Sequence, residues 1–235
     1  MSDKRFAEAP RKDSAPRFNA SVADQRLPSA RQVTCWGLWV EGGCLLAALV
    51  LASCGWYDLD QPLSHFWRLD LGSVVVWTLA GLCSTFAVAA AVLLIPWRPF
   101  HEFREFVFRI LIPIFEPLSL TQIALLSASA GIGEEMLFRW CLQGALQSAC
   151  TTVSGTVGAL VVASILFGLC HAMGVMYFLV AALIGGVLGL IMIASGSVVP
   201  SILTHGIYDF FAILMLRHAS RGKAEHAGVR DQVPE

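Results

Sequence analysis

Three charged side chains stand close together in an otherwise apolar stretch of this sequence. They are Glu134, Glu135 and Arg139, and after Arg139 no Asp, Glu, Lys or Arg occurs until Asp209. An ionised side chain at the centre of a bilayer costs about 2.5–3.5 kcal/mol, so such residues persist where they satisfy one another or line a wet cavity. The cluster is therefore a candidate functional site inside a membrane-embedded helix.

Helical geometry separates the two glutamates of this cluster. Residues four apart lie on the same face of a helix, so Glu135 lies over Arg139 and we expect an ion pair between them. Glu134 lies on the face that it shares with Phe138 and has no partner on its own helix. It is available to a water molecule or to another helix, which makes Glu134 the stronger candidate for chemistry.

Two histidines, His171 and His205, are the only histidines between Arg139 and Asp209. Each has a neighbour four residues away, Phe167 before His171 and Asp209 after His205, so each pair shares a helix face. A histidine in an apolar helix often does no more than pack. Because both occur with an unpaired glutamate on a third helix, we assign both to the site.

The composition is that of an integral membrane protein. The chain has 235 residues, of which 56% are apolar and 14% charged, and its mean hydropathy is +0.67. Soluble domains carry charged residues at about 25%. The net charge of −1 gives no reason to expect a nucleic acid partner, and the seven cysteines include no Cys-x-x-Cys pair. We expect an all-α, polytopic bundle of about six transmembrane helices in the lipid bilayer.

Apolar runs and their breaks predict where these helices lie. The predicted spans are about 33–55, 73–97, 119–148, 153–175, 177–196, and a last one from near Pro200 to before Arg217. Residues 98–118 predict an amphipathic helix on the membrane face, with its arginines toward lipid headgroups. The first span contains Glu41, which we interpret as an interfacial acid outside the site.

The chain divides into one membrane domain and two polar ends. Residues 1–31 are predicted to be a disordered cytoplasmic tail, 32–217 the membrane domain, and 218–235 a polar cytoplasmic tail. Lys and Arg gather beside the span ends on one side, whereas the other side has only Arg68. The positive-inside rule therefore predicts that both termini face the cytoplasm.

Straight helices do not bring the candidate residues to one depth. At about 1.5 Å per residue, Glu134 falls about 21 Å from the cytoplasmic end of its span, and His205 about 8–9 Å from the opposite end of its own. His171 falls nearer the cytoplasm. Tilts, breaks or shifted helix boundaries are needed for the three side chains to meet.

Three short motifs resemble the signature motifs of a known family. In order, they are Glu134-Glu135-x-x-x-Arg139, Phe167-x-x-x-His171 and His205-x-x-x-Asp209. Their order and approximate spacing are similar to those of the CPBP family, the CAAX protease and bacteriocin-processing membrane proteins, also called Abi. The resemblance covers about 120–215.

The resemblance implies a glutamate-dependent intramembrane endopeptidase without a metal cofactor, in a prokaryotic cell membrane. Glu134 would hold and deprotonate a water that His171 orients, and His205 and Asp209 would face the carbonyl oxygen. Glu135, Arg139 and Phe167 would support the site. The implied substrate is a membrane-associated or lipidated protein or peptide; nothing in the sequence indicates which one, nor an oligomeric state.

Two residues depart from the family pattern. Trp140 stands where the family commonly has Gly, and we expect it to narrow the cavity or to change a helix contact. Asp209 stands where Asn is common, and an ionised Asp cannot donate a hydrogen bond to an oxyanion.

Two other functions use the same residues. Glu134, His171 and His205 would also make a three-ligand zinc set with an open position, as in zinc-dependent proteases. Alternatively, the cluster would serve packing alone, in a non-catalytic membrane scaffold or immunity protein.

Overall fold

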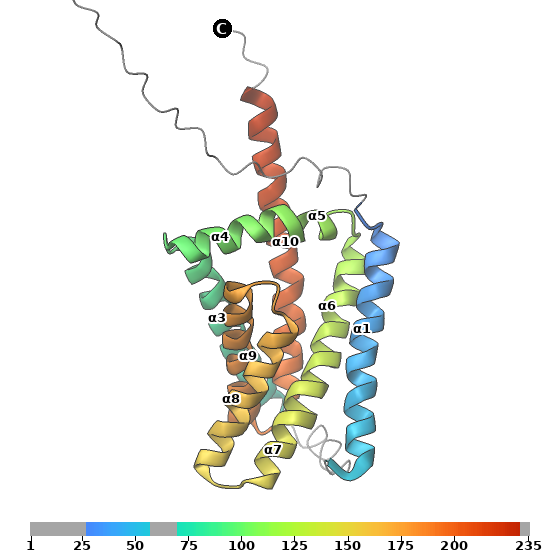
Figure 1. Cartoon of the computed structure of the whole chain (residues 1–235), viewed down its shortest axis with the longest axis vertical. Helices are drawn as coiled ribbons and strands as arrows, with labels where there is room; N and C mark the ends of the chain where they lie inside the picture. Colours follow the sequence, from blue (N-terminus) through green and yellow to red (C-terminus); the bar gives the residue numbers. More distant parts are fainter. Residues whose placement is uncertain (1–26, 57–69, 231–235) are drawn as a thin grey trace, which may run out of the picture.

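The structure is a computed structural model, which describes residues 27–56 and 70–230 (Figure 1). Most of the tail predicted at 1–31, and the last residues of the tail predicted at 218–235, lie outside the described residues. The described residues form helices joined by short turns and contain no strand. The predicted all-α fold is confirmed.

The described helices follow one another with short connections. They are α1 (Ala30–Leu51), α3 (Leu71–Leu94), α4 (Arg98–Phe106), α5 (Ile112–Phe115), α6 (Leu120–Glu135), α7 (Gly144–Ala149), α8 (Val153–Cys170), α9 (Val175–Ser195) and α10 (Val199–Arg230). Three wider, π-type segments continue these helices: η2 (Ala52–Trp56), η3 (Val107–Leu111) and η4 (Met136–Gln143). Through η4, α6 and α7 form one long helix, as predicted for 119–148.

Five of the described helices are long and apolar enough to cross a membrane. They include α1, α3, α8, α9 and the part of α10 up to Ala219. A sixth span results if residues 98–115 and 120–149, which bend by 114° at their junction, are counted together. The chain is an integral membrane protein with several membrane-spanning helices, as the composition predicted.

The segment α4–η3–α5 crosses one end of the bundle, above the hairpin of α8 and α9 (Figure 1). One of its arginines has hydrogen-bond partners within the protein. Arg104 donates from Nη1 to the carbonyl oxygen of Val92 at 2.6 Å, and it also contacts the carbonyl of Ile95 at 3.3 Å. The last carbonyls of a helix have no partner within it, so Arg104 caps the end of α3.

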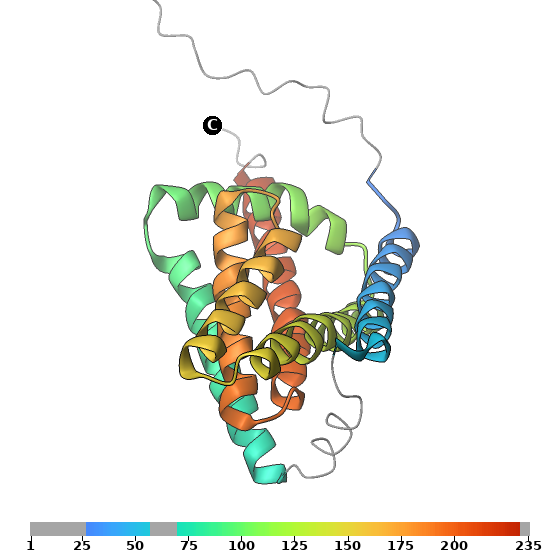
Figure 2. The same cartoon turned by 60° about the horizontal axis from the view of Figure 1, so that its bottom comes forward.

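Glycines let α6 pack closely between α1 and α10, which lie on either side of it in Figure 2. A Cβ on Gly131 would lie 2.8 Å from the carbonyl oxygen of Ile202 on α10. A Cβ on Gly133 would lie 2.5 Å from the carbonyl oxygen of Glu41 on α1. Side chains at either position would push the helices apart, so these glycines determine how closely α1 and α10 approach the segment that carries Glu134.

Two helix ends differ from the predicted boundaries. α8 ends at Cys170 instead of 175, because the backbone leaves the helix at His171 and turns before α9 begins at Val175. α10 continues past Arg217 to Arg230, so most of the predicted polar tail is helical. This extension contains several Ala, Lys, Glu and Arg, which favour helix, and no Pro.

Candidate active site

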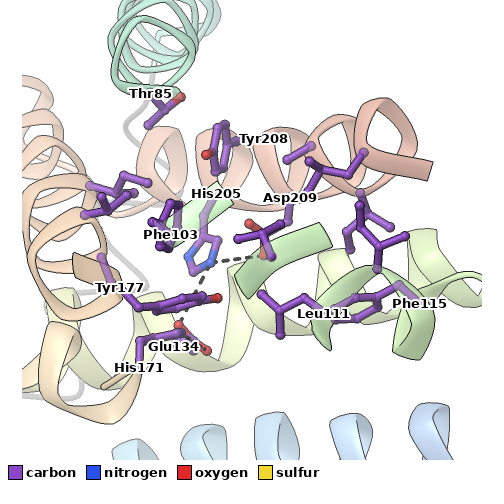
Figure 3. Close-up of a pocket in the computed structure, with 18 of the residues that line it drawn as sticks. Thr85, Phe103, Leu111, Phe115, Glu134, His171, Tyr177, His205, Tyr208 and Asp209 are labelled. Atoms are coloured by element: carbon purple, nitrogen blue, oxygen red, sulfur yellow. Dashed lines mark ion pairs between the residues drawn. The ribbon is translucent and has the colours of Figure 1, made fainter. Parts of the chain in front are cut away.

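The four candidate catalytic side chains meet in one cavity (Figure 3). Glu134 comes from α6, His171 from the end of α8, and His205 and Asp209 from α10. The cavity measures about 270 Å³ and all four side chains line it. α8 ends at Cys170, and the turn that follows it lies beneath α4 (Figure 1), which leaves His171 at the depth of the cavity.

Glu134 lies opposite both imidazoles. Its Oε1 is 3.6 Å from Nε2 of His171, and its Oε2 is 3.9 Å from Nε2 of His205. The carboxylate is 11% exposed, and Oε2 has no hydrogen-bond partner among the described residues. Contacts of this length between polar groups commonly hold a bridging water. Glu134 therefore has the surroundings expected of a group that binds water.

The ion pair predicted between Glu135 and Arg139 is confirmed. Nε of Arg139 lies 3.2 Å from Oε2 of Glu135, and both side chains are fully buried. Nη2 of Arg139 also donates to the carbonyl oxygen of Gly185 at 3.1 Å, and its guanidinium lies 4.2 Å from the centre of the Phe167 ring. These contacts join α6, α8 and α9 beneath the site.

His205 is oriented by Glu135. Its Nδ1 lies 2.8 Å from Oε1 of Glu135, and a carboxylate accepts, so we assign the hydrogen to Nδ1. Nε2 then faces Glu134 and lies 3.4 Å from Oδ2 of Asp209. In the neutral ring Nε2 carries a lone pair, so it donates a hydrogen bond only when the ring is an imidazolium.

His171 is oriented by the backbone of its own helix. Nδ1 lies 2.9 Å from the carbonyl oxygen of Phe167, which accepts, so Nδ1 carries the hydrogen and Nε2 presents a lone pair toward Glu134. The imidazole lies close to two aromatic rings. The Phe167 ring centre is 4.6 Å away, and the Tyr177 ring is parallel within 7° at 6.5 Å.

Apolar side chains form most of the remaining cavity wall. Phe103, Leu111 and Phe115 line it from α4, η3 and α5, and Ile184 and Leu188 line it from α9. The helix predicted for the membrane face therefore also covers the cavity at one end (Figure 3). A cavity with this wall can hold an apolar chain of a ligand next to the polar side chains at the base of the cavity.

Glu41 lies closer to the site than we predicted. Its Oε2 is buried without a hydrogen-bond partner among the described residues, and its charge interacts with that of Glu134. The interpretation of Glu41 as an interfacial acid is wrong, because Gly133 lets α1 approach α6 beside Glu134. The sequence did contain a signal for this role of Glu41, namely a single acidic residue within an apolar span.

The two departures from the family pattern have different surroundings. Trp140 is buried on the side of α1, against Ala48 and Ala52, and does not line the cavity. Trp140 therefore takes part in a helix contact and does not narrow the cavity. Asp209 does line the cavity, as an acceptor beside Nε2 of His205.

The described residues contain no group of three His, Cys, Asp or Glu side chains arranged to hold a metal ion. In the zinc alternative the ligands would be Glu134, His171 and His205, whose distances are given above.

A protein-family model described as Rce1-like, a type II CAAX prenyl endopeptidase, matches residues 116–211. Over these residues the chain is similar to this family. The matched segment contains all three motifs, from Glu134 to Asp209, and agrees with the resemblance found at about 120–215. Searches of curated proteins and of solved structures found no match to the chain.

Proposed function

We propose that this protein is an intramembrane endopeptidase that hydrolyses a peptide bond with a water activated by Glu134. The observation that carries the proposal is the position of the Glu134 carboxylate. Within the residues that the structure describes it makes no ion pair with an arginine. It lies 3.6 and 3.9 Å from two imidazole nitrogens and lines an otherwise largely apolar cavity. A carboxylate in such a position can accept a proton from water.

The proposed reaction uses one water and no covalent enzyme intermediate. The water lies between Glu134 and Nε2 of His171, gives a proton to Glu134, and forms the new bond to the carbonyl carbon. The resulting oxyanion faces Nε2 of His205, which donates to it as an imidazolium. When the carbon–nitrogen bond breaks, Glu134 returns the proton to the leaving amine.

Supporting residues hold these groups in place. Glu135 orients His205, Arg139 balances the charge of Glu135, and Phe167 supplies both the carbonyl that orients His171 and a ring against it. Catalytic groups need such support because small displacements reduce the rate strongly.

The apolar wall supports a substrate with an apolar or lipid-modified residue beside the scissile bond. The family description names a prenyl endopeptidase, so a membrane-associated protein or peptide that carries an isoprenoid is the first candidate. The proposed reaction requires no cofactor and no nucleic acid. The bias of Lys and Arg supports cytoplasmic termini, and we expect a prokaryotic cell membrane.

The test uses purified protein in detergent and two internally quenched peptides of the same sequence. Both end in Cys-a-a-X, and one is S-farnesylated. We expect cleavage of the farnesylated peptide, with the new termini identified by mass spectrometry. A protein that is folded by circular dichroism yet leaves both peptides intact contradicts the proposal.

A further inference from the structure

The proposed oxyanion site has few hydrogen-bond donors. The Nδ1 hydrogen of His205 is directed to Glu135, and an ionised Asp209 only accepts. A donor aimed at the developing oxyanion is worth about 2.7–4 kcal/mol, so the cavity should contain a further one. A candidate lies on α9, outside the three motifs.

Tyr177 presents its hydroxyl to the same cavity. It lines the cavity together with Glu134, His205 and Asp209, and it interacts electrostatically with Glu134 and Asp209. The ring is oriented so that its hydroxyl points toward the space between the carboxylates of Glu134 and Asp209 (Figure 3). In the described part of the chain, no hydrogen bond occupies this hydroxyl.

Three aromatic contacts hold the Tyr177 ring. It stacks on His171 at 6.5 Å, and the rings of Phe103 and Phe106 meet it edge-on at 5.5 and 6.2 Å. The ring therefore links α4 to the imidazole that orients the proposed water. Donors that are held in place before the reaction stabilise a developing charge more effectively than mobile ones.

We infer that Tyr177 is a further catalytic residue, whose hydroxyl donates a hydrogen bond to the oxyanion of the tetrahedral intermediate. This inference rests on the proposed function. The tyrosine keeps its proton throughout, so the proton balance of the reaction is unchanged. The hydroxyl supplies the donor that Asp209, in place of Asn, lacks.

Tyr208 provides a matched comparison within the cavity. Its side chain also lines the wall, but its ring packs edge-on against Phe86 of α3 at 5.4 Å. Its hydroxyl interacts electrostatically with Asp209 and Tyr177, and it lies on the side of Thr85 (Figure 3). Replacing either tyrosine by Phe removes one oxygen from the same cavity and keeps the ring.

The experiment measures kcat and KM of Tyr177→Phe, Tyr177→Leu and Tyr208→Phe with the farnesylated Cys-a-a-X peptide. We expect Tyr177→Phe to lose about 100-fold in kcat with little change in KM, because the interaction exists only in the transition state. The loss for Tyr208→Phe should be smaller by at least about tenfold. Tyr177→Leu, which also loses the ring contacts, should lose at least as much kcat as Tyr177→Phe.

The inference is overturned if Tyr177→Phe keeps kcat within about threefold of wild type, or if both Phe variants lose the same factor. Thermal unfolding of each variant shows whether the fold is retained, and the conservative Phe change keeps the packing of the ring. Glu134→Gln in the same assay separates the two proposals. If Glu134→Gln is inactive and Tyr177→Phe is normal, only the role of Tyr177 fails; if Glu134→Gln cleaves normally, the proposed function fails.

Discussion

Glu135 holds both a buried arginine and a buried histidine, with Oε2 at 3.2 Å from Nε of Arg139 and Oε1 at 2.8 Å from Nδ1 of His205. One carboxylate thus joins the ion pair of its own helix to the imidazole of α10. The two adjacent glutamates have separate tasks, since each oxygen of Glu135 contacts a basic side chain of the protein whereas Glu134 faces the cavity.

Glu135→Gln should destabilise the fold, because it leaves the Arg139 charge buried without its counter-charge. Breaking a buried ion pair in this way costs about 3–5 kcal/mol. We expect a clearly lower unfolding temperature in detergent and reduced cleavage, as His205 loses its charged partner. Glu134→Gln is the matched control on the next residue, and it should unfold near the wild-type temperature. Equal unfolding temperatures for the two variants would contradict the division of tasks.

Gly133→Ala should separate α1 from α6. The new Cβ would lie 2.5 Å from the Glu41 carbonyl oxygen, a backbone atom that cannot rotate away. We expect a loss of about 1–3 kcal/mol in stability, as for other overpacked helix contacts, together with lower activity.

Gly158→Ala is the control for this change, because nothing lies within 4 Å of its Cβ position. It should be neutral or stabilise the protein by about 0.4–1 kcal/mol. Thermal unfolding compares the two variants, and a Gly133→Ala protein as stable as Gly158→Ala would show that the helices tolerate the extra carbon.

Asp209→Asn should preserve cleavage, because the amide keeps the shape of the side chain and adds a donor beside the proposed oxyanion. Asp209→Leu should lose most activity. The Asn change should also reduce the penalty of Tyr177→Phe by at least about tenfold, measured as a double-mutant cycle on kcat. Strictly additive effects of the two changes would indicate that the side chains act separately.

Metal removal should leave cleavage unaffected. Prolonged dialysis of the purified protein against EDTA, followed by assay, should keep kcat within about twofold of the untreated protein, because the proposed reaction has no metal step. Loss of activity that added zinc restores, with about one zinc per chain, would instead favour the zinc alternative that uses Glu134, His171 and His205.

Residue spacing in the sequence correctly predicted the contacts between side chains of the same helix. The Glu135–Arg139 ion pair and the shared faces of Phe167 with His171 and of His205 with Asp209 all follow from the four-residue repeat. The apolar runs likewise predicted the spans to within a few residues at most ends.

Contacts between different helices could not be predicted from residue spacing along one helix. The bond from Glu135 to His205, the approach of Glu41 to Glu134 and the place of Tyr177 all depend on how helices rotate and tilt against one another. The depth of His171 also required knowing that α8 ends at Cys170, directly before His171. The glycines that allow these close approaches are visible in the sequence, but their partners are not.

The most direct test of the account is the cleavage rate of Glu134→Gln relative to wild type, measured on the farnesylated peptide with protein of unchanged unfolding temperature. The amide has the shape of the carboxylate but cannot take a proton from water. We predict a loss of at least about 1,000-fold in kcat, as for removal of a base that acts together with its neighbours. A folded Glu134→Gln protein that cleaves at the wild-type rate would contradict the account.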